Sequence, residues 1–190
     1  MKKRKNAKKG RIALFGTLKV MVAVSLLCAM SIILGKYLAI NIGEVLRFSF
    51  ENMTIILSGM MFGPLIGLVS GIAADLIGCL LVGYAVNPIV TVGAGAIGFL
   101  AGLIYFLMNK TKLPYAIKIL FPIVISHLIG SVIIKSVGLA AFYDMPIIVL
   151  MLWRGLNYLL IGAAEYALIY FIMKNKTINS QFEFLKRGSI

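Results

Sequence analysis

The sequence predicts an all-α membrane protein, a compact bundle of six transmembrane helices in which the second helix is short. The chain has 190 residues, of which 61% are hydrophobic and 13% are charged, whereas a typical globular protein has about 25% charged residues. Its mean hydropathy of +1.02 is too high for a soluble core of this size. The length suits one domain, and the two cysteines lie in apolar runs without redox or metal-ligand spacing.

Apolar runs give the six segments in order. About 20 helical residues cross the hydrocarbon layer of a bilayer. The first run covers 18–38 and precedes a polar, charged connection at 39–52. Pro64 can begin a helix, because its missing N–H would be unpaired there anyway. The other five expected segments are 53–62 (the short one), 65–83, 89–108, 116–142 and 147–173.

The basic residues predict the orientation. The formal net charge is +13, and in so apolar a chain this excess indicates cytoplasmic loops rather than nucleic-acid binding. Eight Lys/Arg precede residue 20, three lie between 110 and 118, and four follow residue 173. An even number of spans puts all of these on one side, so we expect both termini in the cytoplasm. Residues 1–17 and 174–190 would be cytoplasmic tails flanking a membrane domain at 18–173.

Small residues recur at four-residue spacing in two neighbouring segments. Gly63, Gly67 and Gly71 form one stripe, and Ala94, Gly98 and Gly102 form another, at a spacing that lets helix backbones approach closely in lipid. The stripes could form a dimer face, but packing within the chain is the favoured interpretation.

Ionisable side chains inside membrane segments are costly and are functional candidates by default. The helical rise of about 1.5 Å per residue places four basic residues in the outer half of the bundle or its outer loop. Cations there suit an anionic ligand, because the donors of Arg form a planar fork that matches carboxylates. An acid among them suits a ring with N–H donors, and aromatic residues suit a flat ring. The candidate binding residues are Lys36, Arg47, Asp75, Tyr84, Asn87, Lys135, Trp153, Arg154 and Asn157.

Each candidate also has a structural interpretation. Lys36 could extend to the membrane interface, and Lys135 and Arg154 could pair with an acid such as Asp75 or Asp144. Aromatic residues near helix ends are often interfacial anchors. His127 is expected to be a packing residue rather than a proton relay, and Glu165 to pair locally or to couple to a partner.

Motifs for chemistry are absent from the sequence. It contains no G-x-x-x-x-G-K-[ST] motif, no H-E-x-x-H motif and a single histidine, so we expect neither an enzyme nor a metal or cofactor site. The two halves also lack the paired Gly/Pro-broken helices of inverted-repeat transporters. A small binding protein without its own source of energy either requires a partner that supplies energy or works without energy.

The runs LGKYLAI, RFSFENM, FGPLIGLVSGIAADLIG, NPIVTVGAG and WRGLNYLLIGAAEY resemble the substrate-binding S component of energy-coupling factor (ECF) vitamin transporters. The resemblance covers about 18–171 and is strongest to the folate-specific branch. It implies a multi-pass protein of the bacterial cytoplasmic membrane that captures its vitamin in the outer half, under the 39–52 connection. It also implies assembly with a transmembrane coupling protein and two cytoplasmic ATPases, with reorientation of the loaded subunit in the bilayer.

The resemblance also assigns residues. The face that contacts the coupling protein carries an Ala-x-x-x-Ala pair, matched here by Ser25 and Ala29. Folate has a flat pterin, an aromatic linker and two carboxylates, so Arg47, Lys135 and Arg154 are expected to include the carboxylate partners. Asp75 or an Asn is expected to meet the pterin.

Three alternatives remain open at this stage. The ligand could be another vitamin, such as pantothenate or, less favoured, thiamine or riboflavin. Thiamine is a cation, so the four basic residues of the outer half disfavour it. The chain could be a small gradient-driven transporter that uses an intramembrane acid, Asp75 or Glu165. An intramembrane enzyme or assembly factor is disfavoured by the lack of a catalytic constellation.

Overall fold

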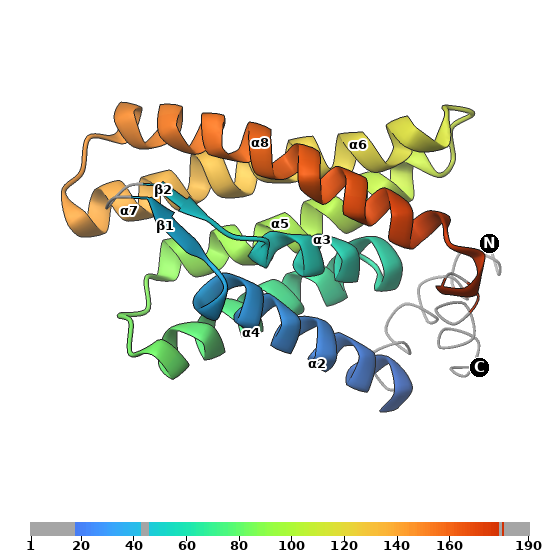
Figure 1. The fold of residues 1–190 in the computed structure, drawn as a ribbon, viewed down its shortest axis with the longest axis horizontal. Coiled ribbons are helices and arrows are strands. Elements are labelled where there is room, and N and C mark those ends of the chain that lie inside the picture. The colour runs from blue at the N-terminus through green and yellow to red at the C-terminus, as the bar shows by residue number, and fades with distance from the viewer. Residues whose placement is uncertain (1–17, 43–45, 179, 181–190) are drawn as a thin grey trace, which may run out of the picture.

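The computed structural model describes residues 18–42, 46–178 and 180, including their side chains except those at 41–42 and 46–47. The tail expected at 1–17 lies outside the described residues. The described chain is a bundle of membrane-length helices packed around one short helix (Figure 1). Its helical elements are α2 (Leu18–Ile32), η2 (Ile33–Tyr37), α3 (Glu51–Phe62), α4 (Pro64–Val82), α5 (Pro88–Met108), α6 (Tyr115–Ser126), η3 (His127–Ile134), α7 (Lys135–Tyr143) and α8 (Ile147–Lys174).

Five helical spans among the described residues are long and apolar enough to cross a membrane. The all-helical membrane fold predicted from the apolar runs is therefore confirmed, and α3 is the short helix that was expected. Two spans are composite, because α2 continues into the π-helical η2, and α6, η3 and α7 form one span with a π-helical middle. Pro64 and Pro88 each begin a helix, as their missing N–H groups allow.

The polar connection at 39–52 contains a hairpin that the sequence analysis did not predict. Strand β1 (Ile40–Ile42) pairs antiparallel with β2 (Leu46–Phe48), with Asn41 opposite Arg47. Apolar and polar residues alternate in both strands, as in a strand with one face packed, but three-residue strands are too short to stand out from a loop. β2 contacts α8, so the hairpin lies over one end of the bundle (Figure 1).

Helices α3, α4 and α5 meet backbone to backbone through glycines. A Cβ at Gly98 of α5 would overlap the carbonyl oxygen of Gly67 of α4, and one at Gly59 of α3 would overlap the carbonyl of Gly98. Gly71 lies equally close to Ala94 across the α4–α5 contact. The small-residue stripes therefore serve packing within the chain, as favoured above, and they set the spacing of the three central helices.

Gly63 has a different role from the one its spacing suggested. It lies between α3 and α4 with φ +109°, and an added Cβ would meet nothing within 4 Å. Glycine is needed there for the backbone conformation rather than for close approach. The stripe on α4 thus consists of Gly67 and Gly71.

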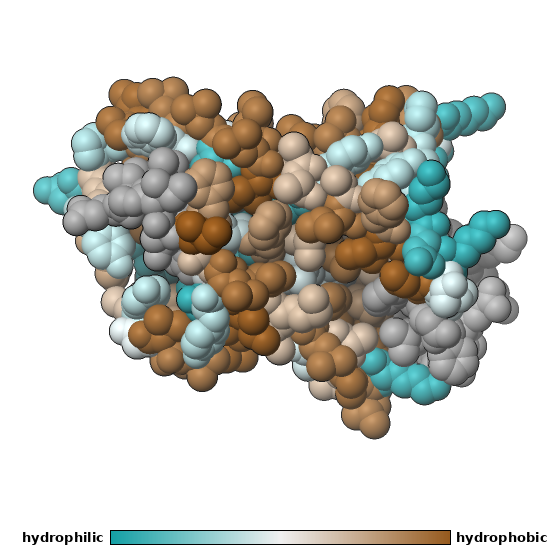
Figure 2. Space-filling view, in the orientation of Figure 1, coloured by the Kyte–Doolittle hydropathy of each residue, from teal (hydrophilic) through white to brown (hydrophobic). Residues whose placement is uncertain are grey.

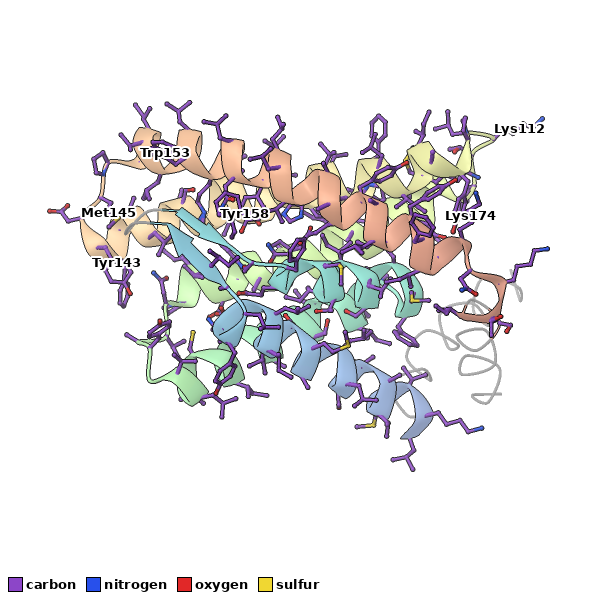
Figure 3. All side chains as sticks on the ribbon, in the orientation of Figure 1. Lys112, Tyr143, Met145, Trp153, Tyr158 and Lys174 are labelled. Carbon is purple, nitrogen blue, oxygen red and sulfur yellow. The ribbon has the colours of Figure 1, made fainter. Side chains whose placement is uncertain are left out.

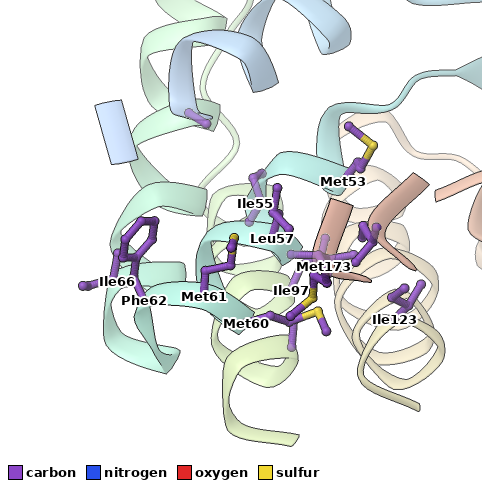
Figure 4. Close-up of a cluster of buried hydrophobic side chains, with 14 of the residues drawn as sticks. Met53, Ile55, Leu57, Met60, Met61, Phe62, Ile66, Ile97, Ile123 and Met173 are labelled. Carbon is purple, nitrogen blue, oxygen red and sulfur yellow. The ribbon is translucent and has the colours of Figure 1, made fainter. Parts of the chain in front are cut away.

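The apolar core surrounds α3, whose residues from Asn52 to Phe62 are all buried. Met53, Ile55 and Met60 pack with Ile97 of α5 and Ile123 of α6, as Figure 4 shows. Helix α3 contacts α2, η2, α4, α5 and α8, so it is the element that the spans enclose.

The outside of the bundle is apolar over most of the visible face (Figure 2). Leu152, Leu156 and Leu159 of α8 are among many exposed large hydrophobic residues. Hydrophilic side chains gather at the end where Figure 3 labels Lys112 and Lys174, opposite the end with Trp153 and Tyr143. A lipid-solvated helix bundle requires such a surface, since every helix satisfies its own backbone.

Gly98→Ala tests the glycine junction. The new methyl group would meet backbone atoms, which cannot move aside, so we expect a loss of about 1–3 kcal/mol of stability or more. Thermal unfolding of the detergent-purified protein measures it. The matched control is Gly162→Ala on α8, where an added Cβ meets nothing within 4 Å, and an equal loss in both variants would contradict this packing.

Candidate substrate-binding site

The polar side chains of α8 lie on its inward face. Arg154, Asn157, Ile161 and Glu165 follow a spacing of three and four residues, which keeps them on one side of a helix. Asn157 and Glu165 are buried, and Arg154 is half-buried near the end where β2 contacts α8. One face of this helix therefore carries polar groups from the hairpin end into the middle of the bundle.

Arg154 has buried donors without acceptors. Its Nε and Nη1 atoms are inaccessible to solvent and make no hydrogen bond within the part of the chain that the structure describes. Neither Asp75 nor Asp144, the acids considered as partners, is its hydrogen-bond acceptor. A guanidinium in this state is suited to a bidentate anion, since charge-assisted hydrogen bonds to carboxylate are among the strongest in proteins.

Lys135 pairs with an acid that the sequence analysis did not single out. Its Nζ lies 3.6 Å from Oε1 of Glu51, and both side chains are largely buried. The stem of Lys135 crosses Gly93 of α5, where a Cβ would come within 2.7 Å of its Cγ. Gly35 likewise leaves room for the Glu51 side chain. Glycines on neighbouring helices thus fix the positions of both charges.

Lys36 contacts Tyr84 and Cys79, and Asp75 lies one helical turn before Cys79 on α4. Lys36 lies 3.8 Å from Sγ of Cys79 and 5.8 Å from the centroid of the Tyr84 ring. Asp75 is buried and accepts a hydrogen bond of 2.7 Å from the hydroxyl of Thr91 on α5. The second carboxylate oxygen of Asp75 can still accept from a ligand, because an ionised carboxylate has about four acceptor positions.

Asn87 is committed to the fold. Its Oδ1 accepts from the backbone N–H groups of Ile89 and Val90, and its Nδ2 donates to the carbonyl of Gly138 at 2.8 Å. It is thus the N-cap of α5 and ties that helix to α7. These bonds use its acceptor and one of its two donors, so a ligand role would have to compete with the cap.

The two predicted aromatic residues are exposed. Trp153 is 44% exposed and lies on the outer side of α8 among leucines, apart from the inward face (Figure 3). Tyr84 is 54% exposed, and its ring contacts the ammonium group of Lys36. The environment of Trp153 fits the alternative of an interfacial anchor. Arg47 lies in β2 opposite Asn41, and its side chain lies outside those described.

A chain of buried polar groups extends from this region into the bundle. Asn52 donates from Nδ2 to the hydroxyl oxygens of Ser131 (3.4 Å) and Tyr158 (3.3 Å). Ser131 lies 3.4 Å from Nδ1 of His127, and Nε2 of His127 lies 2.5 Å from Oε2 of Glu165. The His127 ring also stacks on Tyr158 at a centroid distance of 4.7 Å. His127 is thus a paired packing residue, and Glu165 pairs locally, two of the interpretations considered above.

Several of these residues could have been recognised in the sequence. Glu51 and Asn52 directly precede the short apolar run, and polar groups at the start of a membrane-embedded helix are candidates for pairing or binding. Ser131 and Tyr158 carry no sequence signal, because isolated hydroxyl groups are common in transmembrane helices. Their roles depend on the packing of η3 against α8.

Ser25 and Ala29 line an apolar groove on the side of the bundle formed by α2 and α4. The groove lies between α2 and α4, and its volume is about 560 Å³. Val24, Cys28 and Ala73 are among its other lining residues. Ser25 and Ala29 are both exposed, so they are available to another apolar surface.

With this geometry established, comparison with known proteins identifies the family. Residues 19–179 match the profile of the family described as ECF transporter, substrate-specific component. The chain belongs to this family. This family consists of membrane-embedded transporter components, and the resemblance to it drawn from the sequence motifs is confirmed.

Two solved structures and one curated protein are similar to this chain. The crystal structure of FolT bound with folic acid has a TM-score of 0.66 and 20% identity, covering 82% of this chain and 92% of that one. The structure of the S component of a bacterial ECF transporter has a TM-score of 0.60 and 16% identity, covering 81% and 92%. An uncharacterized protein of Mycoplasma pneumoniae is 32% identical over 125 residues, 66% of this chain. The chain spans 44% of the length of that relative.

The Glu51–Lys135 pair can be tested by a double-mutant cycle. Lys135→Met leaves a buried carboxylate without its cation, which costs about 3–5 kcal/mol. Adding Glu51→Gln removes that charge, so the double variant is expected to be more stable than Lys135→Met alone. Thermal unfolding in detergent measures all three variants, and additive losses would show that the two side chains do not interact.

Proposed function

We propose that this chain is the substrate-capture subunit for folate uptake in an ECF-type transporter. It would bind folate with high affinity in the outer half of the bundle, under the hairpin region at 39–52. A partner energising module, with a coupling protein and two ATPases, would then reorient it and release folate to the cytoplasm. Residues 18–173 would form the membrane domain, with both basic tails in the cytoplasm, where the positive-inside rule puts them.

Arg154 is the observation that carries the proposal. Its buried Nε and Nη1 donors have no acceptor among the described residues, and leaving a buried donor unmet costs about 1–3 kcal/mol, more when it is charged. A carboxylate of folate would supply the missing acceptors. The fold similarity to FolT, which binds folic acid, supports this choice of anion.

The other charges fit an anionic ligand with a donor-bearing ring. Lys36, Lys135 and Arg154 outnumber Glu51 and Asp75 among the described residues of the region. A carboxylate at Lys135 would compete with Glu51, since the ammonium group has three donors to share. Asp75 offers an acceptor to ring N–H groups. No resident cofactor is required by this role, because ATP would be used by the partner subunits.

The groove between α2 and α4 is the proposed contact with the coupling protein. Its lining is apolar, and Ser25 and Ala29 have small side chains, so another helix can pack closely there. Asp75 also lies on α4, and Lys36 lies on the span of α2, but neither side chain lines the groove, so coupling and capture would use different faces of these helices.

Folic acid binding tests the capture role directly. The detergent-purified chain is expected to bind folic acid without ATP or a partner, as measured by calorimetry, whereas pantothenate and thiamine are not expected to bind. Arg154→Ala is expected to weaken folic acid binding at least about tenfold, because a charged hydrogen bond contributes about 1.5–3 kcal/mol.

The matched control for Arg154→Ala is Lys174→Ala, which removes a cation from the opposite end of the same helix. Its affinity is expected to equal that of the wild type. Equal affinity of the Arg154 variant would remove that residue from the site, and binding of another vitamin instead of folic acid would overturn the proposed ligand.

Uptake tests the groove. Ala29→Trp would fill the groove, so we expect it to abolish folate accumulation in cells that express the energising module, while folic acid binding to the purified variant persists. Leu26→Trp is the control, because Leu26 is exposed on the same helix but does not line the groove. Normal uptake by the Ala29 variant would exclude this contact.

A further inference from the structure

Asn52 has an amide whose two ends differ in their surroundings. Its Nδ2 donates to both Ser131 and Tyr158. Its Oδ1 is buried and accepts no hydrogen bond from the described residues. The residue is 1% exposed, so water does not reach it in this conformation. A buried amide oxygen without a donor points to a donor supplied from outside the chain.

The direction of the amide follows from the residues behind it. If the carboxyl group of Glu165 accepts in its hydrogen bond to His127, the proton of that bond lies on Nε2. The Nδ1 of a neutral imidazole is then an acceptor, and it takes the hydroxyl proton of Ser131. The oxygen of Ser131 is left to accept from Nδ2 of Asn52.

Reversing the donor and acceptor roles in this series of hydrogen bonds would flip the side-chain amide of Asn52. If His127 carried its proton on Nδ1, it would donate to Ser131, whose hydroxyl would then donate to the amide oxygen of Asn52. Nδ2 would take the place of Oδ1, and the site would present a donor instead of an acceptor. In this arrangement the direction of the Glu165–His127 hydrogen bond is linked, through His127 and Ser131, to the end of the amide that is available.

Resting on the proposed function, we propose that Asn52 is a specificity-determining residue that accepts a hydrogen bond from a ring N–H donor of the ligand. Glu165, His127 and Ser131 are positioning residues that hold its amide in the accepting orientation. Arg154 lies one turn nearer the hairpin end of α8 than Tyr158, so the carboxylates would bind on that side and the ring deeper. The His127 and Tyr158 rings stack on each other beside Asn52, so a ring bound at Asn52 would have aromatic neighbours.

NMR of one residue, His127, reports the direction of these hydrogen bonds through the position of its ring proton. His127 is the single histidine of the sequence, so nitrogen-15 histidine labelling of protein purified on a histidine-free tag gives the signals of one imidazole. We expect the Nε2–H tautomer in the wild type. We expect a change to Nδ1–H in Glu165→Gln, because the new amide can donate to Nε2. A wild-type ring with its proton on Nδ1, or on both nitrogens, overturns the proposal.

Folic acid binding tests the consequence for the site. Ser131→Ala removes the hydroxyl group that joins His127 to Asn52. It is expected to weaken folic acid binding about tenfold, the effect of roughly one lost hydrogen bond. Ser126→Ala removes another buried hydroxyl from the same span, one without a partner among the described residues, and is expected to bind like the wild type. Equal affinities, or equal losses, in the two variants overturn the positioning role.

A double variant separates positioning from a general structural effect. Asn52→Leu removes the acceptor and is expected to weaken binding itself. Adding Ser131→Ala to Asn52→Leu is then expected to cause no further loss of affinity. Additive losses would contradict the claim that Ser131 acts through Asn52. If the wild type binds no folic acid, the proposed ligand fails, and the NMR measurement still decides the direction of the chain.

Discussion

The contact of three helix backbones at Gly59, Gly67 and Gly98 is the constraint on which the rest of the structure depends. Lipid supplies no hydrophobic force between helices, so close packing has to hold them together. At these three glycines α3, α4 and α5 meet without side chains between them, and the large side chains lie elsewhere, for example Ile72 and Leu68 of α4 against Gly95 of α5. The three helices then contact α2 on one side and the span of α6, η3 and α7 on the other.

The same use of glycine recurs at the charged residues. Lys135 passes over Gly93, Lys36 over Gly78, and Glu51 against Gly35, and in each case an added Cβ would come too close to the charged side chain. A long side chain confined in this way loses its conformational freedom when the protein folds, so little remains to be lost in any later binding step. Preorganisation of that kind improves affinity, because less conformational entropy is lost on binding.

The fold could be predicted from the sequence because lipid imposes one rule on every span. Apolar runs of sufficient length have to be helices, and Pro64 and Pro88 mark two of their starts. The hairpin could not be predicted, because β1 and β2 have three residues each and are held by their position over the bundle.

The site was only partly predictable, and the reason is specific to each residue. The cost of burying charge identified Lys135 and Arg154 as unusual, but not Glu51 as the acid beside Lys135. Pairing depends on which helices are neighbours, and the sequence gives composition rather than adjacency. Asn87 was chosen for its polarity, although an Asn before a Pro is also a strong helix N-cap, and that is its role here.

The buried polar groups of this bundle fall into two kinds, and the difference bears on function. Asp75, Asn87 and Lys135 each have a partner in the chain, so the fold itself accounts for their burial. The Nε and Nη1 atoms of Arg154 and the Oδ1 of Asn52 have none among the described residues. One is a pair of donors and the other an acceptor, and a molecule that carries both a carboxylate and a ring N–H group would satisfy them together. Under the proposed function, the groups with partners account for the fold, and these two are the proposed contacts of the ligand.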